Sequence, residues 1–392
     1  LDYDPYVGVL GVGRIKGGQM KPGQQVAVIN REGEQRNAKL LEVKGFLGLN
    51  RVNVDEANAG DIVCISGISN LRISDTICSR EAPEAMPALT VDEPTVSMTF
   101  QVNDSPFAGQ DGKYVTSRQI KERLEQELLH NVALRVEQGD AAEKFTVSGR
   151  GELHLAVLIE NMRREGFELG VSRPEVVQRE NNGAKEEPYE QVVVDIEEQH
   201  QGSVMEEMGN RRAEMQNMVP DGRGRVRIDF IMPARGLIGF RSQFLTLTQG
   251  SGILTHVFDH WGPVKGGMAE HRHNGAIVSM VKGTTTAYSL FTLQDRGRLM
   301  VGPGAEVYEG MVIGIHAREN DLTVNPTKGK QLTNVRAAGT DENLVLTPPI
   351  EMTLENALEF IDDDELVEVT PNNLRVRKKL LTETDRKRAG KK

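Results

Sequence analysis

The sequence predicts a multidomain β and α+β protein: an N-terminal β-barrel, two split-βαβ (ferredoxin-like) domains and a C-terminal mixed β/α domain. A chain of 392 residues exceeds the length at which one hydrophobic core is usual. Its first part repeats short β-branched runs at intervals of about ten residues, which is typical of small β units. Its middle part twice shows the order strand, helix, strand, strand, helix, strand.

The composition, 38% apolar and 27% charged, is typical of a soluble globular protein. No apolar run approaches the ~20 residues that span a bilayer. Cys64 and Cys78 cannot build a disulfide framework, and their apolar strand contexts favour inert packing over a reactive thiolate. The start, "LDYDPYVGVLGVGRIKGG", has the pattern of strand and turn and not of an export signal. We therefore expect a cytoplasmic setting and a further segment before residue 1.

Residues 1–84 are predicted to form the β-barrel. Gly-rich or polar turns separate the apolar runs "VGVLGVGRI", "QQVAVIN", "AKLLEVKGF", "DIVCIS" and "LRISDTI". The proline-containing stretch "EAPEAMPAL" breaks this period and predicts a linker to the next domain.

The first split-βαβ domain is predicted over residues 91–185. After the strand "TVSMTFQV", Thr116 and Gln119 can open a helix as a capping box. The apolar stripe of that helix consists of Ile120, Leu124 and Leu128. A hairpin follows around Gln138, and then a second helix ends at Gly166 before the strand "FELGV". The apolar face of the second helix consists of Leu155, Leu158, Ile159 and Met162.

The second split-βαβ domain is predicted over residues 186–264, after the polar link "NNGAKEEP". Ser203 and Glu206 can cap a first helix that runs through Met208. The strands "YEQVVVDIE" and "RVRIDFIMP" flank it, and "PDGRG" is the hairpin turn. A second helix is predicted up to Leu247, and "ILTHVFDH" is the last strand. The apolar face of this second helix consists of Leu237, Phe240, Phe244 and Leu247.

Residues 265–392 are predicted to form the mixed β/α domain. It contains a helix around "AYSLFTLQDRG", a mobile polar loop at about 326–345 and a docked amphipathic helix in "TLENALEFIDDDE", whose carboxylates face solvent. From Leu374 to Lys392 there are nine Lys or Arg and two Asp or Glu, so this basic tail carries +7 and the rest of the chain −17. Such a tail is either a disordered terminus or a contact for a polyanion.

Few patterns in the sequence point to catalysis. No G-x-x-x-x-G-K-[ST] string is present, so the chain lacks the loop that cradles nucleotide phosphates. "DGRG" at residues 221–224 is better explained as a hairpin turn than as part of a nucleotide site. Glu152 and His154 at a helix start could form an acid/base pair, although capping of the helix explains them better. We therefore predict no catalytic site in this chain.

Four histidines raise the question of a metal site. His256 and His260 would lie about 13 Å apart in a strand, too far to share a zinc ion. His271 and His273 in "EHRHNG" have no obvious third ligand. No metal site is predicted, and a metal hydrolase built on these four side chains is a less supported alternative.

Cationic side chains gather in the second split-βαβ domain. They are Arg211, Arg212, Arg223, Arg225, Arg227, Arg235 and Arg241. Forked guanidinium groups suit phosphate, and structured RNA is read largely through backbone, shape and 2′-hydroxyls. The alternative is that these arginines balance Glu206, Glu207 and Glu214. Further candidate RNA contacts are Lys328, Lys330 and Arg336 in the polar loop, and Arg375, Arg377, Lys378 and Lys379 in the tail.

Four long motifs follow one another along the chain. "GRIKGGQMKPGQQV" and "ANAGDIVCISG" resemble the second-domain β-barrel of translational GTPases. "SGRGELHLAVLIENMRREGFELGVSRPEVVQRE" resembles the third domain of elongation factor G, and "RGLIGFRSQFLTLTQGSGILTHVFDHW" resembles its fifth. The part that contains "RGRLMVGPGAEVYEGMVIGIHARENDLTVNP" resembles the C-terminal domain peculiar to the BipA/TypA family of ribosome-associated GTPases.

This resemblance implies several properties. The GTP-binding domain of the family is absent, so the chain resembles a C-terminal fragment with no cofactor of its own, while GTP and Mg²⁺ belong to the intact protein. The short link before residue 186 has no room for the fourth domain of elongation factor G, which argues against translocation. The implied partners are the ribosome, with its 23S rRNA and ribosomal proteins, and A-site tRNA. The implied roles are large-subunit assembly, stress responses and growth in the cold.

By the same resemblance, the loop at residues 326–345 is the expected contact for rRNA or tRNA, and the protein is expected to be a monomer that binds no membrane. Two other classes of function stay open. One is the metal hydrolase described above. The other is a protein-interaction scaffold that uses the acidic helix and contacts no RNA.

Overall fold

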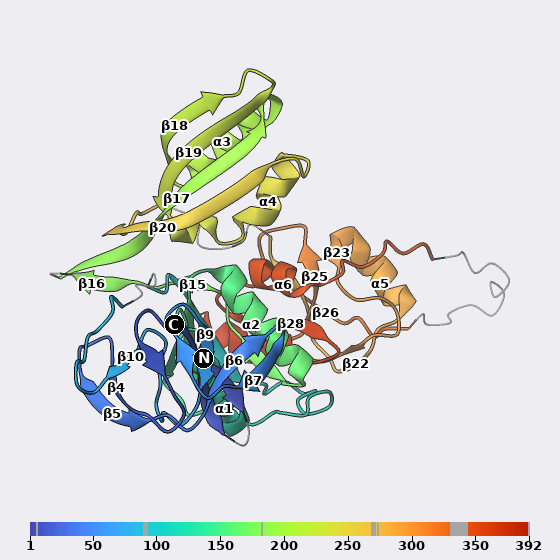
Figure 1. The fold of residues 1–392 in the computed structure, drawn as a ribbon. Helices are drawn as coiled ribbons and strands as arrows, with labels where there is room; N and C mark the ends of the chain where they lie inside the picture. The colour runs from blue at the N-terminus through green and yellow to red at the C-terminus, as the bar shows by residue number, and fades with distance from the viewer. Residues whose placement is uncertain are drawn as a thin grey trace, which may run out of the picture. The chain divides into compact units, whose positions relative to one another are not determined.

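The computed structural model describes residues 1–4, 7–88, 93–181, 183–267, 272, 274–329 and 344–390, whose fold is shown in Figure 1. The chain forms two compact units. One consists of Leu1–Asp92 with Glu122–Leu134, and the other of Glu93–Lys121 with Arg135–Lys392. The sequence predicted four domains, and residues assigned to the last three share the second unit.

Short strands in three small sheets form the N-terminal β unit. Their bounds are β1 Asp2–Asp4, β2 Gly8–Arg14, β3 Gln19–Met20, β4 Gln25–Ile29, β5 Gln35–Lys39, β6 Val43–Leu47, β7 Asn50–Asn53, β8 Ala57–Asn58, β9 Ile62–Ile65 and β10 Thr76–Ser79. The sheets have the orders β1-β2-β9-β6-β7, β10-β4-β5 and β3-β8. Val28 of β4 and Val63 of β9 belong to one buried cluster. The described residues therefore form sheets around a shared core and not one continuous closed sheet.

The segment after residue 93 has the element order that the sequence predicted. Its elements are β11 Val96–Val102, α1 Ser117–His130, β12 Arg135–Gln138, β13 Lys144–Gly149, α2 Glu152–Glu165 and β14 Leu169–Val171. The strands lie antiparallel in the order β12-β13-β11-β14, which is the order of a split-βαβ sheet. Short strands β15 (Glu175–Val176) and β16 (Arg179–Asn181) follow.

The predicted helix boundaries in this segment are confirmed. The N–H of Gln119 donates to Thr116 Oγ1 at 3.4 Å, and the N–H of Thr116 donates to Gln119 Oε1 at 3.1 Å, so the capping box forms. Helix α2 ends at Gly166, whose φ of 98° lies in the left-handed region that favours glycine.

The C-terminal part of the chain extends this same sheet. Strand β27 (Glu365–Val369) pairs antiparallel with β14, and β28 (Leu374–Lys378) pairs with β27. Glu368, which is fully buried, accepts hydrogen bonds from Asn103, Ser105 and Tyr308. Because these bonds join residues far apart in sequence, the C-terminal hairpin and the first split-βαβ segment fold as one body.

Of the two alternatives for the basic segment 374–392, the disordered terminus is wrong for most of its length. Residues 374–378 are the sheet strand β28, and α7 (Glu383–Ala389) is a helix with Thr382 as its N-cap. Charged residues at alternate positions of "LRVRK" hid the strand, because their ion-pair partners come from elsewhere in the chain.

The second split-βαβ domain has the strand order β18-β19-β17-β20. Its elements are β17 Ala184–Glu197, η1 Glu198–His200, α3 Gln201–Asn210, β18 Glu214–Pro220, β19 Arg225–Pro233, η2 Ala234–Leu237, α4 Phe240–Leu247 and β20 Ile253–Pro263. Helices α3 and α4 cover one face of the sheet (Figure 1). The core between them includes Val192, Phe230 and Phe244.

Both helices of this domain differ from the prediction. Helix α3 begins at Gln201, directly after a 3₁₀ turn, so Ser203 lies inside the helix and its hydroxyl donates to the carbonyl of His200 at 3.0 Å. The predicted second helix is divided into η2 and α4. Gly239, with a φ of 67°, interrupts the helical backbone between them.

The remaining C-terminal elements include a four-stranded sheet with the order β23-β25-β21-β26. Their bounds are β21 Ala276–Ser279, β22 Gly283–Thr284, α5 Ala287–Leu293, η3 Gln294–Arg296, β23 Gly297–Leu299, β24 Glu306–Val307, β25 Val312–His316, β26 Leu322–Val324 and α6 Leu354–Phe360. Leu354 and Leu358 of the acidic helix α6 are buried, as predicted, and so is Ile361, which directly follows the helix. Glu365, however, is fully buried and paired with Arg272, so the prediction of solvated carboxylates is wrong there.

Candidate nucleic-acid interface

The structure divides the predicted RNA contacts by whether their charge is already paired inside the protein. Lys330, Arg336, His271 and His273 lie outside the described residues, as does most of the loop at 326–345. The other predicted cations are described below, first those held by the fold and then those that face solvent.

Arg211 is a structural clamp. Its guanidinium is paired with Glu207 at 2.7 Å and donates to the Gly236 carbonyl at 2.7 Å and to Gln243 Oε1 at 2.8 Å. It also lies 4.9 Å from the centre of the Phe240 ring. These contacts join the end of α3 to η2 and α4, which argues against the prediction that Arg211 contacts RNA. The alternative that Glu207 balances an arginine is correct here.

Arg225 and Arg235 are also held by the fold. Arg225 is paired with Asp195 at 2.6 Å on the outer face of the sheet and stays partly exposed. Arg235 is paired with the fully buried Glu187 at 3.2 Å and donates to the Lys265 carbonyl at 2.6 Å. Since removing Arg235 would leave a buried carboxylate unpaired, we assign Arg235 to the fold.

The cations of β28 are mostly buried. Arg375 is paired with Glu368 at 3.1 Å, and Arg377, 1% exposed, is paired with Asp104. Lys378, 2% exposed, is paired with Asp364 and Glu365, both at 2.9 Å, and with Asp321. Burial by itself would lower the pKa of Lys378, but these carboxylates outweigh it and raise the pKa. This burial and pairing argue against the prediction that Arg375, Arg377 and Lys378 contact RNA.

Five predicted cations are exposed and form no ion pair with a described residue: Arg212, Arg223, Arg241, Lys328 and Lys379; Arg227 is also exposed but is paired with Asp229 at 3.2 Å. We call these the exposed cation set. Arg212 donates to the Gly267 carbonyl at 3.1 Å, and Lys379 donates to the Asp363 carbonyl. Neither bond neutralises the charge. The structure thus leaves cations free in the second split-βαβ domain and in the C-terminal domain.

Arg223 lies at the tip of the β18–β19 hairpin, in the turn that the sequence predicted. Asp221 Oδ1 accepts the N–H of Arg223 at 2.7 Å and that of Arg225 at 3.0 Å. These backbone bonds lower the pKa of the Asp221 carboxyl. Because the aspartate is engaged by the backbone, the Arg223 side chain is left exposed at the hairpin tip.

Glu152 and His154 have separate partners, which argues against an acid/base pair. His154 Nδ1 accepts the N–H of Arg150 at 3.3 Å, next to the start of α2. The Glu152 carboxylate accepts the N–H of Gly239. Burial, and then the nearby Glu359, raise the pKa of Glu152 to about 7.

Replacing Glu152 with Gln is expected to stabilise the protein at about pH 8 but not at about pH 5. The pKa of about 7 exceeds the ordinary 4.5, so the wild type loses stability as pH rises from 4.5 through 7, and glutamine does not ionise. We expect a gain of about 1–2 kcal/mol at the higher pH, since the side chain is partly solvated. Thermal unfolding at both pH values measures the difference in stability, with the exposed Glu143→Gln as control. An equal effect at both pH values would contradict this prediction.

The described residues do not form a metal site. His256 is paired with Glu190, whose hydrogen bond raises the pKa of the imidazole, and His260 is paired with Asp259 at 2.5 Å. Both histidines lie in β20, as predicted. Within the described ranges, no group of three or more His, Cys, Asp or Glu could hold a metal ion. Burial raises the pKa of Cys64, in keeping with inert packing.

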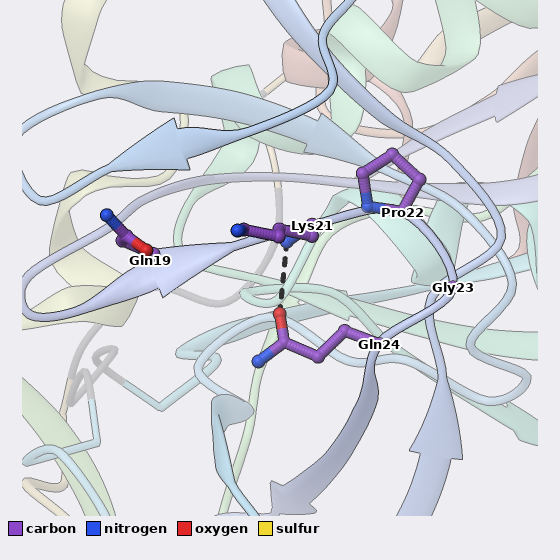
Figure 2. A pocket seen from close by; sticks show the side chains of 5 residues that line it. All are labelled: Gln19, Lys21, Pro22, Gly23 and Gln24. Atoms are coloured by element: carbon purple, nitrogen blue, oxygen red, sulfur yellow. Dashed lines mark hydrogen bonds between the residues drawn. The ribbon is translucent and has the colours of Figure 1, made fainter.

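A surface hollow in the N-terminal β unit carries no catalytic groups. Figure 2 shows this hollow of about 410 Å³, which is lined by Gln19, Lys21, Pro22, Gly23 and Gln24. The backbone N–H of Lys21 donates to Gln24 Oε1 at 3.0 Å (Figure 2), and the Lys21 ammonium is paired with Glu56 at 2.8 Å. Lys21, the only charged residue that lines this hollow, is therefore already in an ion pair.

Comparison with known proteins gives the family. The model of elongation factor Tu domain 2 matches residues 8–78, that of the elongation factor G C-terminus matches 184–272, and that of the TypA/BipA C-terminal domain matches 274–383. The large ribosomal subunit assembly factor BipA of Escherichia coli (strain K12) is 62% identical over 391 residues. The chain belongs to the BipA/TypA family.

Two further relatives with the same name extend the comparison. The proteins of Haemophilus influenzae and Buchnera aphidicola are 61% and 53% identical over 391 residues. In each case all of this chain is matched, and it spans 64% of the length of the relative. The resemblance to the BipA/TypA family is thus confirmed. None of the helices in the described part of the chain is long and apolar enough to cross a membrane.

Proposed function

We propose that this chain is the ribosome-binding part of a large-ribosomal-subunit assembly factor. The observation that carries the proposal is the match of the whole chain to relatives named for that role. The exposed cation set supports it, because unpaired Arg and Lys side chains on a protein of net charge −10 are local anchors for phosphate. In this proposal, Arg212, Arg223 and Arg241 contact 23S rRNA, while Lys328 and Lys379 contact A-site tRNA or rRNA.

The remaining parts of the proposal concern the intact protein. GTP and Mg²⁺ are bound and GTP is hydrolysed outside this chain, whose sequence has no phosphate-binding loop. The protein acts as a cytoplasmic monomer with roles in stress and growth in the cold. Ribosomal proteins are further partners, and the acidic helix α6 is a candidate surface for them.

The double variant Arg223→Gln, Arg241→Gln is expected to weaken ribosome binding and its dependence on salt. Each lost phosphate contact reduces the slope of log K against log salt by about 0.7–0.9, so the pair should reduce it by about 1.5. Sedimentation of this chain with 70S ribosomes over a range of KCl concentrations measures the slope.

Arg227→Gln is the matched control, because Arg227 lies on the same hairpin and is paired with Asp229 at 3.2 Å. An unchanged slope in the double variant would remove the phosphate contacts. The scaffold alternative would be favoured if the affinity of the wild type for ribosomes did not depend on salt and the wild type crosslinked only to ribosomal proteins.

A further inference from the structure

Helix α5 presents two aromatic rings to solvent. Tyr288 is 43% exposed and Phe291 is 40% exposed, whereas Leu290 and Leu293 on the other side are buried. Residues three apart on a helix are neighbours on its surface, so the two rings form one patch. Aromatic pairs are costly to leave in water unless a partner covers them.

The helix that carries the rings is held rigidly. Thr286 caps it by accepting the N–H of Ser289 at 3.2 Å, and the hydroxyl of Ser289 donates to the Asn325 carbonyl at 2.8 Å. Leu290 belongs to a buried cluster with Tyr308 and Ile313. The rings are therefore presented in a fixed place, which lowers the ordering cost of binding a partner.

Two segments that are distant in sequence flank the two ends of α5. At its start, the N–H of Thr286 donates to the Pro326 carbonyl at 3.1 Å, and the hydroxyl of Thr286 donates to the Lys328 carbonyl. At its end, Gln294 Nε2 donates to the Val345 carbonyl at 3.1 Å, and the N–H of Thr347 donates to Gln294 Oε1 at 3.1 Å. Figure 1 shows α5 and β23 in this part of the fold.

The charge around the rings is positive. The exposed cations on α5 and the segments next to it are Lys282, Arg296, Arg298 and Lys328, and the exposed carboxylates are Asp295 and Glu306. Among the described residues none of these four cations forms an ion pair, but the Lys282 ammonium lies 5.7 Å from the centre of the buried Phe107 ring. An exposed aromatic pair bordered by unpaired cations has the chemistry that binds unpaired nucleotides, in which bases stack and phosphates are neutralised.

We propose that Tyr288 and Phe291 form a stacking platform for unpaired nucleotides of RNA, with Lys328 contacting the adjoining phosphates. The proposal rests on the proposed function and deepens it by naming the ligand of this part of the C-terminal domain. Duplex RNA is excluded as the ligand of the platform, because its bases are already stacked on each other. None of the predicted contacts included these rings, although their spacing of three residues after a Thr cap was visible in the sequence.

The test measures binding of a fluorescein-labelled single-stranded oligouridylate of about 12 nucleotides, and of a blunt RNA duplex of the same length, to this chain by anisotropy. The variant Tyr288→Ala, Phe291→Ala is expected to weaken single-strand binding about 10- to 100-fold and to leave its salt slope unchanged. Tyr288→Phe and Phe291→Tyr keep the rings and should bind within about two-fold of wild type. Lys328→Gln should instead lower the salt slope by about 0.7.

Thermal unfolding of the alanine variant should show one cooperative transition with a modestly lower midpoint, because each ring is more than half covered by the protein. Single-strand binding unchanged by the alanine variant overturns the platform, and so does an equal loss on the duplex. If the alanine variant abolishes a self-association of the wild type seen by sedimentation, the patch is an interface between copies and the platform is wrong. Salt-dependent ribosome binding by the wild type, alongside unchanged single-strand binding by the variant, overturns the platform alone. A wild type that binds neither ribosomes nor RNA overturns the proposed function as well.

Discussion

Replacing Lys378 with Met is expected to lower the free energy of unfolding by about 3–5 kcal/mol. The ammonium is 2% exposed and is paired with Asp364 and Glu365 at 2.9 Å and with Asp321. Methionine fills a similar volume but leaves the fully buried Glu365 with Arg272 as its remaining ion-pair partner. The cost comes from buried negative charge that loses its compensation, and not from a lost surface contact.

The adjacent Lys379 provides the matched control. Its side chain is exposed and donates to the Asp363 carbonyl, so Lys379→Met should change stability by less than about 0.5 kcal/mol. Denaturant unfolding followed by circular dichroism measures both variants. The pKa of Asp321 is lowered below its ordinary 3.8 in the folded protein, so the deficit of Lys378→Met should persist from neutral pH down to about 3.8 and narrow only below it, where the carboxylate becomes protonated. Equal stability of the two variants would contradict the burial of Lys378.

Replacing Arg211 with Ala is expected to lower the free energy of unfolding by about 2–4 kcal/mol without changing the salt slope of ribosome binding. The guanidinium joins α3 to η2 and α4 through Glu207, Gly236 and Gln243. Charged hydrogen bonds in a partly buried setting contribute more to stability than exposed ones. Their loss leaves the Glu207 carboxylate and the Gly236 carbonyl unsatisfied.

Trp261, the only tryptophan in the chain, reports on this domain because it lies in β20. Unfolding followed by its fluorescence therefore measures the effect of Arg211→Ala directly. Arg212→Ala is the matched control, since Arg212 is exposed and makes one bond to a carbonyl. It should leave the unfolding midpoint nearly unchanged and reduce the salt slope. If Arg211→Ala reduced the salt slope and left the unfolding midpoint unchanged, Arg211 would again be a candidate RNA contact.

Local signals predicted many of the elements. The capping box at Thr116 and the left-handed Gly166 act through neighbouring residues, and both were predicted correctly. The division of the second helix at Gly239 was missed, because a single glycine inside an apolar period does not by itself show that the backbone turns left-handed.

Two larger features could not be predicted from local signals. Strand β28 was taken for a tail because its cations look unpaired in a linear sequence. The pairing of β27 with β14 was also missed, since the residues of a strand do not by themselves identify the strand to which it hydrogen-bonds.

The sequence by itself determined the period of many elements, the turn at Asp221 and the family to which the chain belongs, because these depend on neighbouring residues and on similarity along the whole chain. The tertiary structure alone decided which cations are available to a ligand. Arg223 and Lys378 are equally charged in the sequence, but one lies at a hairpin tip and the other among three carboxylates. The reason is that Coulomb energy depends on distance in space and on exclusion of water, both of which arise only when distant segments fold together.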